Sequence, residues 1–499
     1  MEHRVREGAV VSEFLAAYPD YASTARLDEL RAAEYSYLDS GGHIYLDYTG
    51  AGLAADAQLR AQVRRLRGGC FGNPHSENPA SVASTLLIEQ AREAVLRYFN
   101  APAEEYAVIF TQNATGACRL VGEAYQFRPG SRLVLTADNH NSVNGLREYA
   151  RARGAAVRYV RLSPAELRVA EADVRVALGG GERPGRGRRR GLFAYPAQSN
   201  FSGVQHPLAW VGQAQAAGYD VLLDAAAFVP TNRLDLGVIK PEFVAVSWYK
   251  MFGYPTGIGC LLARRDALGR LRRPWFSGGT IWGASVQGGW HRLADDETAF
   301  EDGTLNFLGI PDVKTGLAWI SGIGIDLIHR RVSYLTSWLL DGLTHLKHSN
   351  GAPMVRVYGP VDGPVDGPVN GTARGGTVAF NFTDDQGAVV DERVVARDTS
   401  AAGISVRTGC FCNPGAGESA FGLTRRALRG TWWRRSPWRD LQTMDDYLDL
   451  IGMPSGGAVR VSLGVVSNLA DVERFLDFAE QTYRDAEPGR SGLPPRLRC

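Results

Sequence analysis

The sequence predicts an α/β protein built on a mainly parallel sheet with helices on both faces. Between about residues 43 and 310, short apolar runs typical of strands alternate with helical patterns. Alternation of this kind is typical of a parallel sheet whose crossover connections are helices. At 499 residues the chain is also too long for one small core. We therefore expect two or three domains, of which the sheet domain is the largest.

Three parts can be distinguished along the chain. Residues 1–42 have a helical pattern, and we expect this segment to join the smaller domain. Residues 43–310 carry the alternating pattern of the large domain. Residues 311–499 form the third part, which begins with one long helical pattern from Ile310 to about Leu346 that connects it to the large domain. Strands are expected at His43–Tyr48, Tyr106–Phe110, Arg132–Thr136, Gly191–Tyr195, Asp220–Leu223, Val244–Ser247, Thr377–Phe382, Ile404–Val406 and Ala458–Leu463.

Composition excludes several classes of protein. Charged residues make up 22% and hydrophobic residues 44%, which is ordinary for a soluble globular chain. The net charge of +2 gives no global reason to expect nucleic acid or an anionic membrane as partner. The N-terminus lacks the apolar stretch of a secretory signal, and no run approaches the ~18 apolar residues of a membrane span. The six cysteines are sparse and irregularly spaced, so we expect a cytoplasmic chain with reduced thiols.

Three segments are expected to be loops. Residues 180–191 are basic and glycine-rich, which favours a solvated loop over an anion- or RNA-binding one. Residues 359–371 repeat the tetrapeptide GPVD, and such a density of glycine and proline indicates a surface insertion. Residues 421–440 are rich in arginine and tryptophan. This last segment is interpreted as a partly exposed connection, with a lid or a partner-binding segment as the alternative.

Two charged residues lie at the ends of apolar runs. Asp224 follows the run Tyr219–Leu223, and Lys250 ends the run that begins at Phe243, just before a glycine-rich turn over residues 251–259. Ligands of parallel sheets bind at the carboxyl ends of the strands, where both residues are expected. A lysine and an aspartate there can hold a planar cofactor from two sides. The pair predicts pyridoxal 5'-phosphate (PLP), with Lys250 as its Schiff-base lysine and Asp224 at its pyridinium nitrogen.

Two further segments suit the same cofactor. Residues 112–116, with Thr115 among them, follow one expected strand and precede a helix, so backbone N–H groups and a hydroxyl can bind a phosphate there. His140 follows the strand Arg132–Thr136, where a flat imidazole can stack on a pyridine ring. A single loop histidine is usually structural, so this assignment depends on its neighbours.

Longer motifs connect these residues into an ordered series. They are Tyr45–Asp47, Phe71–Ser76, Asp138–His140, Ala197–Gly203, Leu223–Pro230, Tyr249–Gly257, Phe300–Thr304, Arg407–Ala416 and Val459–Gly464. In this order, over almost the whole chain, they resemble the motifs of class V aminotransferase-fold enzymes. Within that group the chain is similar to the N-terminal cysteine desulfurase domain of molybdenum cofactor sulfurases. The resemblance implies a PLP-dependent transferase of fold type I, with a seven-stranded sheet and a smaller α+β domain.

The resemblance also implies roles for single residues. Lys250 looks like the Schiff-base lysine, Asp224 like the pyridinium partner, His140 like the stacking base and Asn200 like the residue beside the ring hydroxyl. Positions that match phosphate contacts are Thr115, Ser247 and Tyr249 and, from a second subunit, Thr280. The last of these implies a homodimer.

The substrate side of the site is implied in the same way. Arg460 matches the arginine that clamps the substrate carboxylate, a task that suits a bidentate guanidinium. Arg407 is a second candidate on this side. Two positions depart from related patterns, because Ala227 stands where many cysteine desulfurases have glutamine or histidine, and Gly417 stands where molybdenum cofactor sulfurases have a third cysteine.

Cys410 and Cys412 flank Phe411 and have three interpretations. A metal site is disfavoured because no second cysteine or histidine pair lies nearby in the sequence. A buried structural pair is the second possibility. The third is a thiol nucleophile on a mobile loop, because cysteine desulfurases of this fold carry their catalytic cysteine five residues after an arginine. Cys412 holds that position relative to Arg407, whose charge favours a thiolate.

The favoured function is therefore a PLP-dependent cysteine desulfurase or sulfurtransferase. It would move the sulfur of L-cysteine, or of a cysteine-derived small molecule, to Cys412 as a persulfide and release alanine. A sulfur-acceptor protein is a further expected partner. The first alternative is a PLP-dependent carbon–sulfur lyase that acts on a cysteine conjugate or a specialised metabolite, and it would use Lys250, Asp224 and Arg460 without Cys412. An aminotransferase or epimerase of the same fold, and a domain that only binds a partner, are the remaining alternatives.

Overall fold

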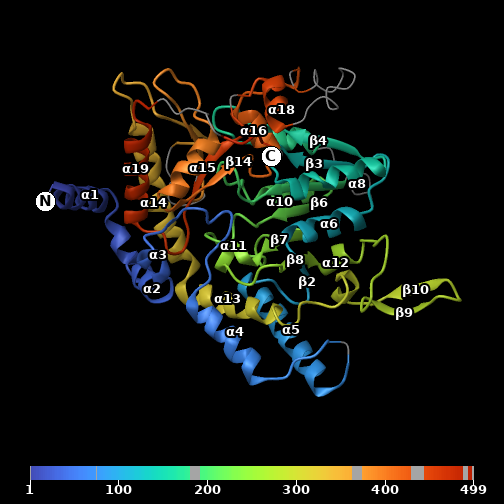
Figure 1. Cartoon of the computed structure of the whole chain (residues 1–499). Helices are drawn as coiled ribbons and strands as arrows, with labels where there is room; N and C mark the ends of the chain where they lie inside the picture. Colours follow the sequence, from blue (N-terminus) through green and yellow to red (C-terminus); the bar gives the residue numbers. More distant parts are fainter. Residues whose placement is uncertain are drawn as a thin grey trace.

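The structure is a computed structural model that describes most of the chain (Figure 1). The residues that it describes are 2–74, 76–179, 191–361, 374–426, 428, 443–453, 455–486 and 493–496. Almost all of the basic loop at 180–191, most of the GPVD segment at 359–371 and much of the arginine- and tryptophan-rich segment at 421–440 lie outside these residues. The interpretations of these three segments stay predictions.

The large sheet has seven strands. They are β2 (Tyr106–Thr111), β3 (Arg132–Thr136), β4 (Ala156–Val160), β5 (Gly191–Pro196), β6 (Tyr219–Asp224), β7 (Phe243–Ser247) and β8 (Gly259–Arg264). Their order is β2-β8-β7-β6-β5-β3-β4. β8 pairs antiparallel with β2 and β7, and all other neighbouring strands of this sheet are parallel. The predicted mainly parallel sheet is confirmed. β4 and β8 were not predicted, and the first residue of β8, Gly259, was expected to end a glycine-rich turn.

Both faces of this sheet are covered by helices. Along β2, Val108 and Phe110 belong to one buried cluster, whereas Ala107 and Ile109 belong to a second cluster on the opposite face. Helices α5 (Pro79–Tyr98) and α10 (Trp210–Ala216) contribute to the first cluster, and α6 (Ala114–Ala124) and α8 (Leu146–Ala152) contribute to the second. A strand buried on both faces has apolar residues at consecutive positions, which explains why the sheet could be found as apolar runs.

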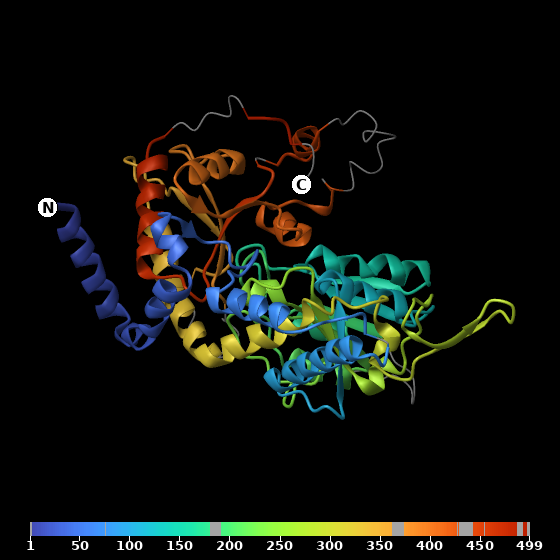
Figure 2. The ribbon, with the colours of Figure 1, turned by 60° about the horizontal axis from the view of Figure 1, so that its bottom comes forward.

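A smaller sheet is formed by later parts of the chain. Its antiparallel order is β11 (Val355–Tyr358), β12 (Thr377–Phe382), β15 (Ala458–Ser462) and β14 (Arg407–Gly409). Helices α14 (Ile325–His345) and α15 (Glu392–Ala401) pack against it, and α19 (Leu469–Tyr483) packs aromatic rings on β12. Figure 2 shows these elements, in colours from yellow-orange to red, lying to one side of the large sheet. The expected smaller α+β part of the fold is thus present.

Two expectations about connecting elements are wrong. The strand predicted at His43–Tyr48 is only the two-residue β1 (Ile44–Tyr45), and it pairs with β13 (Ile404–Ser405) instead of joining the large sheet. The single helix predicted from Ile310 to Leu346 is two helices, α13 (Ile310–Ile323) and α14. They are separated by Gly324, whose φ of +97° is readily adopted by glycine alone.

The N-terminal helices pack against C-terminal elements. They are α1 (Glu2–Ala17), a 3₁₀ helix (Pro19–Thr24), α2 (Arg26–Glu34) and α3 (Ser36–Ser40). Arg31 of α2 donates to Asp471 of α19 at 3.0 Å, and Arg331 of α14 donates to Asp28 of α2 at 2.7 Å. Both arginines are buried. The interpretation of residues 1–42 as a segment that joins the smaller domain stays a prediction, as does the division of the chain at residues 42 and 310.

The remaining elements connect these layers. They are α4 (Asp56–Gly68), α7 (Asn141–Asn144), α9 (Glu171–Ala177), α11 (Trp248–Phe252), α12 (Arg265–Leu268), β9 (Ile281–Ser285), β10 (Trp290–Leu293), a 3₁₀ helix (Glu297–Phe300), α16 (Pro414–Ala420) and α18 (Met444–Ile451). The β9–β10 hairpin extends away from the body of the molecule (Figures 1 and 2). Among the described residues, no helix combines the length and apolar character needed to cross a membrane.

Candidate active site

Asp224 and Lys250 lie at the same edge of the large sheet. Asp224 is the last residue of β6, and Lys250 lies in α11, directly after the neighbouring strand β7. Both line one cavity at the carboxyl ends of these strands. The other residues around this cavity are Asn113, Ala114, Thr115, His140, Ser142, Pro196, Gln198, Asn200, Ala226, Ala227, Ser247 and Tyr249. The cavity therefore brings together most of the residues that the sequence pointed to.

The environment of Lys250 makes its amine easier to deprotonate. Burial lowers the pKa of this amine, and Arg460 lowers it further, whereas the carboxylate of Asp224 acts in the opposite direction. The described part of the chain offers its Nζ atom no hydrogen bond. A lysine amine with a lowered pKa loses its proton more readily, and the deprotonated amine is a nucleophile for a carbonyl group. Asp224 accepts a hydrogen bond from the Ala226 backbone at 3.0 Å, which fixes its carboxylate in the cavity.

His140 is held by the first turn of α7. Its Nδ1 atom accepts from the Ser142 backbone at 3.1 Å, so the proton of the neutral ring lies on Nε2. Burial and the charge of Lys250 lower the pKa of this imidazole, which favours the neutral form. The Ser142 hydroxyl also lies 2.6 Å from that of Thr115. Ser142 was not predicted, although its place in the first turn after His140 is a signal for such a contact.

One end of the cavity suits a phosphate group. Asn113 caps helix α6 by accepting from the Gly116 backbone at 2.8 Å, and Thr115 lies in the first turn of the helix. The Ser247 hydroxyl is buried and has no hydrogen-bond partner among the residues that the structure describes. Buried hydroxyls are nearly always paired, so this atom has room for a ligand. A helix N-terminus with an unpaired hydroxyl and Tyr249 beside it fits the phosphate of PLP.

Residues 410–413, which lie between β14 and α16 and which we call the cysteine loop, contact α7. Cys412 accepts a hydrogen bond from the Asn141 backbone through its carbonyl oxygen at 2.8 Å. Asn141 directly follows His140, so the loop meets the wall of the cavity. Phe411 and Cys412 have φ angles of +53° and +52°, a conformation that few residues other than glycine adopt. Such backbone strain is found mainly at functional sites, where the surrounding contacts maintain it.

Two asparagines provide those contacts. Asn200 donates to the carbonyl of Phe411 at 2.8 Å. Asn413 is fully buried, and its Nδ2 atom donates to the Asp138 carbonyl at 2.7 Å and to Asn200 Oδ1 at 2.9 Å. Its Oδ1 atom caps α16. Asn200 thus joins the cysteine loop to the cavity. Asn413 was not predicted, although an asparagine followed by proline is a typical start of a helix.

The two cysteines of the loop differ. Cys410 is in a disulfide, so the expectation that all thiols are reduced is wrong at this position. Cys412 is free and exposed. Among the described residues the only other exposed free cysteine is Cys70, while Cys118 and Cys260 are buried. Among the described residues, no group of three or more His, Cys, Asp or Glu side chains is placed so that it could hold a metal ion, which leaves the metal interpretation of the cysteine pair unsupported.

Asp47 connects the two arginines predicted on the substrate side. Its Oδ1 atom accepts from Arg460 at 2.9 Å, and its Oδ2 atom accepts from Arg407 at 2.6 Å. The hydrogen bonds of Arg407 therefore go to Asp47 and not to Cys412. One carboxylate between two guanidinium groups leaves a net charge of +1. Asp47 had no predicted role because its partners are distant in the sequence.

Arg460 lies under the cysteine loop. It donates to the Asn200 carbonyl at 2.9 Å, and its guanidinium lies 4.7 Å from the centre of the Phe411 ring. Its Nε atom is buried and has no partner in the described part of the chain, so the guanidinium has an unused donor there. Burial lowers the pKa of this guanidinium, and Asp47 opposes that effect. A partly unpaired arginine with net positive surroundings suits a carboxylate ligand.

Thr280 does not line the cavity. It is buried, and its hydroxyl donates to the Ser277 carbonyl at 2.7 Å within its own turn. Its predicted contact with a cofactor of a second subunit stays a prediction.

The fold and the site together define a class of protein. A buried lysine amine with a lowered pKa, an aspartate at the neighbouring strand end and a helix N-terminus are the elements of a PLP site. The family model "Aminotransferase class-V" matches residues 44–475. The chain belongs to the class V aminotransferase family, as its motifs suggested.

Curated relatives include molybdenum cofactor sulfurases from plants and animals. The one from Solanum lycopersicum is 34% identical over 97% of this chain and 61% of its own length. The one from Homo sapiens is 36% identical over 94% of this chain and 54% of its own length. The chain therefore spans a little more than half of the length of the relatives it matches.

Solved structures share the fold. An apo cysteine desulfurase from Thermococcus onnurineus NA1 superposes with a TM-score of 0.71 at 24% identity, covering 91% of this chain and 97% of that one. The cysteine desulfurase CsdA from Escherichia coli gives a TM-score of 0.67 at 20% identity, covering 91% and 98%. At these identities the likeness concerns the fold.

Proposed function

We propose that this chain is a PLP-dependent cysteine desulfurase or sulfurtransferase that moves the sulfur of L-cysteine to Cys412 and releases alanine. The observation that carries the proposal is the position of Cys412. It is a free, exposed thiol whose own backbone is hydrogen-bonded to Asn141, next to His140 in the cavity wall. A lyase or an aminotransferase of this fold has no need of a thiol there. The relatives named molybdenum cofactor sulfurase and the desulfurases that share the fold agree with this choice.

The cavity residues have complementary tasks. Bound PLP would supply an electron sink that stabilises negative charge on the amino acid. Lys250 would hold the cofactor covalently and, once displaced by substrate, carry a proton at Nζ. Asp224 would keep the pyridine nitrogen protonated, and the neutral ring of His140 would lie on the cofactor face. Phosphate contacts are assigned to Thr115, Ser247 and Tyr249, and the ring hydroxyl to Asn200.

Cys412 performs the sulfur step. Its thiolate attacks the sulfur of bound cysteine, so an S–S bond forms and the carbon–sulfur bond breaks. The electron pair of that bond goes to the substrate carbon, which takes up a proton and leaves as alanine. Cysteine and one protein thiol thereby become alanine and one persulfide, and no outside oxidant is needed. Arg460 would orient the substrate through its carboxylate.

The proposal extends to assembly and partners. A homodimer would let Thr280 of one subunit contact the phosphate in the other. A sulfur-acceptor protein or small molecule would then collect the persulfide sulfur from the exposed Cys412. The cytoplasm is the compartment we propose for this reaction.

Product analysis tests the function. Purified protein supplied with PLP and L-cysteine should form alanine in the presence of a small thiol. Cys412→Ala should abolish this alanine, and Cys70→Ala, which removes the other exposed free thiol, should leave it unchanged. Formation of pyruvate and ammonia that persists in Cys412→Ala would instead identify a carbon–sulfur lyase.

A further inference from the structure

The last described residues of the chain, 493–496, are fixed beside the cysteine loop. The Arg496 backbone donates to Asp445 at 2.8 Å and accepts from the Met444 backbone at 2.7 Å, at the start of α18. Arg393 of α15 donates to the Pro494 carbonyl at 2.7 Å. These contacts fasten the segment, which we call the C-terminal strap, to two helices of the smaller part of the fold.

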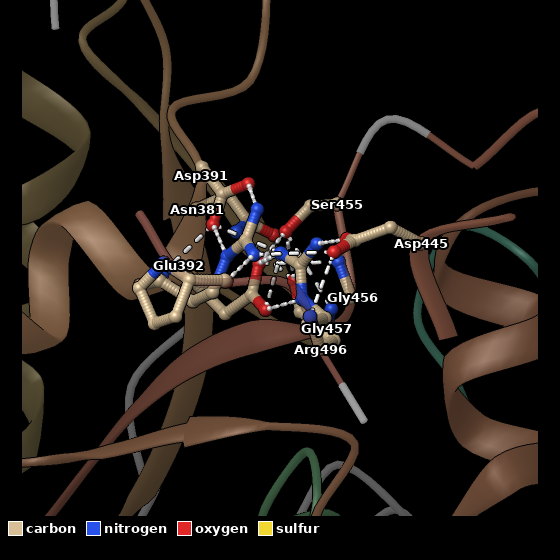
Figure 3. Close-up of polar contacts among 10 residues, drawn as sticks. Asn381, Asp391, Glu392, Asp445, Ser455, Gly456, Gly457 and Arg496 are labelled. Atoms are coloured by element: carbon tan, nitrogen blue, oxygen red, sulfur yellow. Dashed lines mark hydrogen bonds and ion pairs between the residues drawn. The ribbon is translucent and has the colours of Figure 1, made fainter. Parts of the chain in front are cut away.

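The strap ends in a cluster of three acidic residues, Asp391, Glu392 and Asp445 (Figure 3). The Arg496 guanidinium bonds to Asp391 at 2.8 Å, to Glu392 at 2.6 Å and also to Asp445. The side chains of Asp391 and Glu392 are only 1% and 5% exposed, and that of Arg496 is 10% exposed. Arg393 is the second cation of the cluster. Among the described residues, loss of Arg496 would leave these three carboxylates with Arg393 as their cation, a costly arrangement for buried charges.

Glu392 connects the strap to the segment that precedes β15, which in turn contacts the end of β14 just before the cysteine loop. Its carboxylate also accepts from the Ser455 hydroxyl and, at 3.1 Å, from the Gly456 backbone. The next residue, Gly457, is packed so closely on Gly409 that a Cβ atom would lie 2.1 Å from the Gly409 carbonyl. Gly409 is the last residue of β14 and directly precedes Cys410. Figure 3 shows Arg496 among the carboxylates of Asp391, Glu392 and Asp445, with Ser455, Gly456 and Gly457 drawn around it.

Resting on the function proposed above, we propose that Arg496 is a positioning residue for the sulfur step, because the strap sets where the cysteine loop leaves the sheet. Arg496 holds Glu392, Glu392 holds the turn at Ser455–Gly456, and Gly457 supports the end of β14. Arg460 lies three residues further along β15 but has separate anchors in Asp47 and Asn200. The strap therefore acts more on Cys412 than on the binding of substrate.

Alkylation of two cysteines tests this inference without cofactor or substrate. Cys412 and Cys70 are both exposed free thiols, and Cys70 serves as an internal reference. Without reductant, so that the Cys410 disulfide stays intact, iodoacetamide modification of each is followed by mass spectrometry. Arg496→Ala should change the ratio of the Cys412 rate to the Cys70 rate by about 2- to 30-fold. Arg484→Ala removes a surface arginine that is 47% exposed and should leave the ratio unchanged.

Kinetics and a second pair of variants complete the test. Arg496→Ala should lower kcat for alanine formation while KM for cysteine changes little. Arg496→Lys keeps the charge but bridges fewer carboxylates, so its effect should be intermediate. Asp445→Asn weakens the strap from the other side and should change the alkylation ratio in the same way.

Two results would overturn the inference. The first is an unchanged alkylation ratio and kcat in both Arg496→Ala and Asp445→Asn. The second is an equal increase of the Cys412 and Cys70 rates, which would indicate general loosening of the fold. A wild-type protein that forms no alanine would contradict the proposed function, but it would leave the alkylation result valid.

Discussion

Replacing Asn413 by alanine should detach the cysteine loop from the large sheet. Asn413 Nδ2 donates to the Asp138 carbonyl at 2.7 Å and to Asn200 Oδ1 at 2.9 Å, and its Oδ1 atom accepts from Ala416 at 3.2 Å. Loss of a helix N-cap costs about 1 kcal/mol. Each of the two buried acceptors left without a donor costs about 1–2 kcal/mol. We expect the free energy of unfolding to fall by about 3–5 kcal/mol, and alanine formation to fall with it, because Cys412 loses its fixed position.

A matched variant separates the cap from the anchoring of the loop. Asn468 caps α19 by accepting from the Asp471 backbone at 2.9 Å, and it lies outside the cavity lining. Asn468→Ala should cost only about 1 kcal/mol and leave turnover unchanged. Thermal melting of both variants, with alanine formation at a temperature where both are folded, provides the comparison. Equal melting temperatures and equal turnover in the two variants would refute the anchoring argument.

Three further predictions concern other parts of the site and the C-terminal cluster. Ser247→Ala should weaken PLP binding by about 5- to 30-fold, measured by titration of the cofactor absorbance, because the unpaired hydroxyl would no longer bind the phosphate. Arg460→Lys should raise KM for cysteine by about tenfold, because an ammonium cannot bind a carboxylate through two parallel hydrogen bonds. Burial opposes ionisation of Asp391, but hydrogen bonds from Arg393 and the charge of Arg496 hold its pKa at about 2, below the ordinary 3.8. The stabilisation by this carboxylate is therefore present above pH 3.8 and is lost as the pH falls towards 2. The difference in melting temperature between wild type and Asp391→Asn should become smaller when the pH is lowered from about 5 to about 3.

Asp224 and Lys250 could be predicted because each follows a run of buried residues. A strand covered on both faces leaves a continuous apolar signal, and the residue after it must lie at the ligand-binding edge. β8 was missed because its first residue, Gly259, belongs to a glycine-rich stretch. The pairing of β1 with β13 could not be seen either, since a two-residue strand gives no periodicity.

Several site residues depend on contacts that no local pattern encodes. Asp47 and Arg460 are 413 positions apart in the sequence, and Asn413 is 213 positions from Asn200. Only the folded chain brings them together. The disulfide of Cys410 could not be predicted either, because a sequence shows where cysteines lie but not which of them are oxidised.

The destination of the substrate sulfur tests the central claim most directly. Protein loaded with PLP is incubated without reductant with L-cysteine that carries a heavy sulfur isotope. The mass of the peptide that contains Cys412 is then measured by mass spectrometry. The account predicts that this peptide gains one labelled sulfur atom, with one alanine released for each persulfide formed. An unlabelled Cys412 peptide, with the heavy sulfur recovered as free sulfide beside pyruvate, would contradict it.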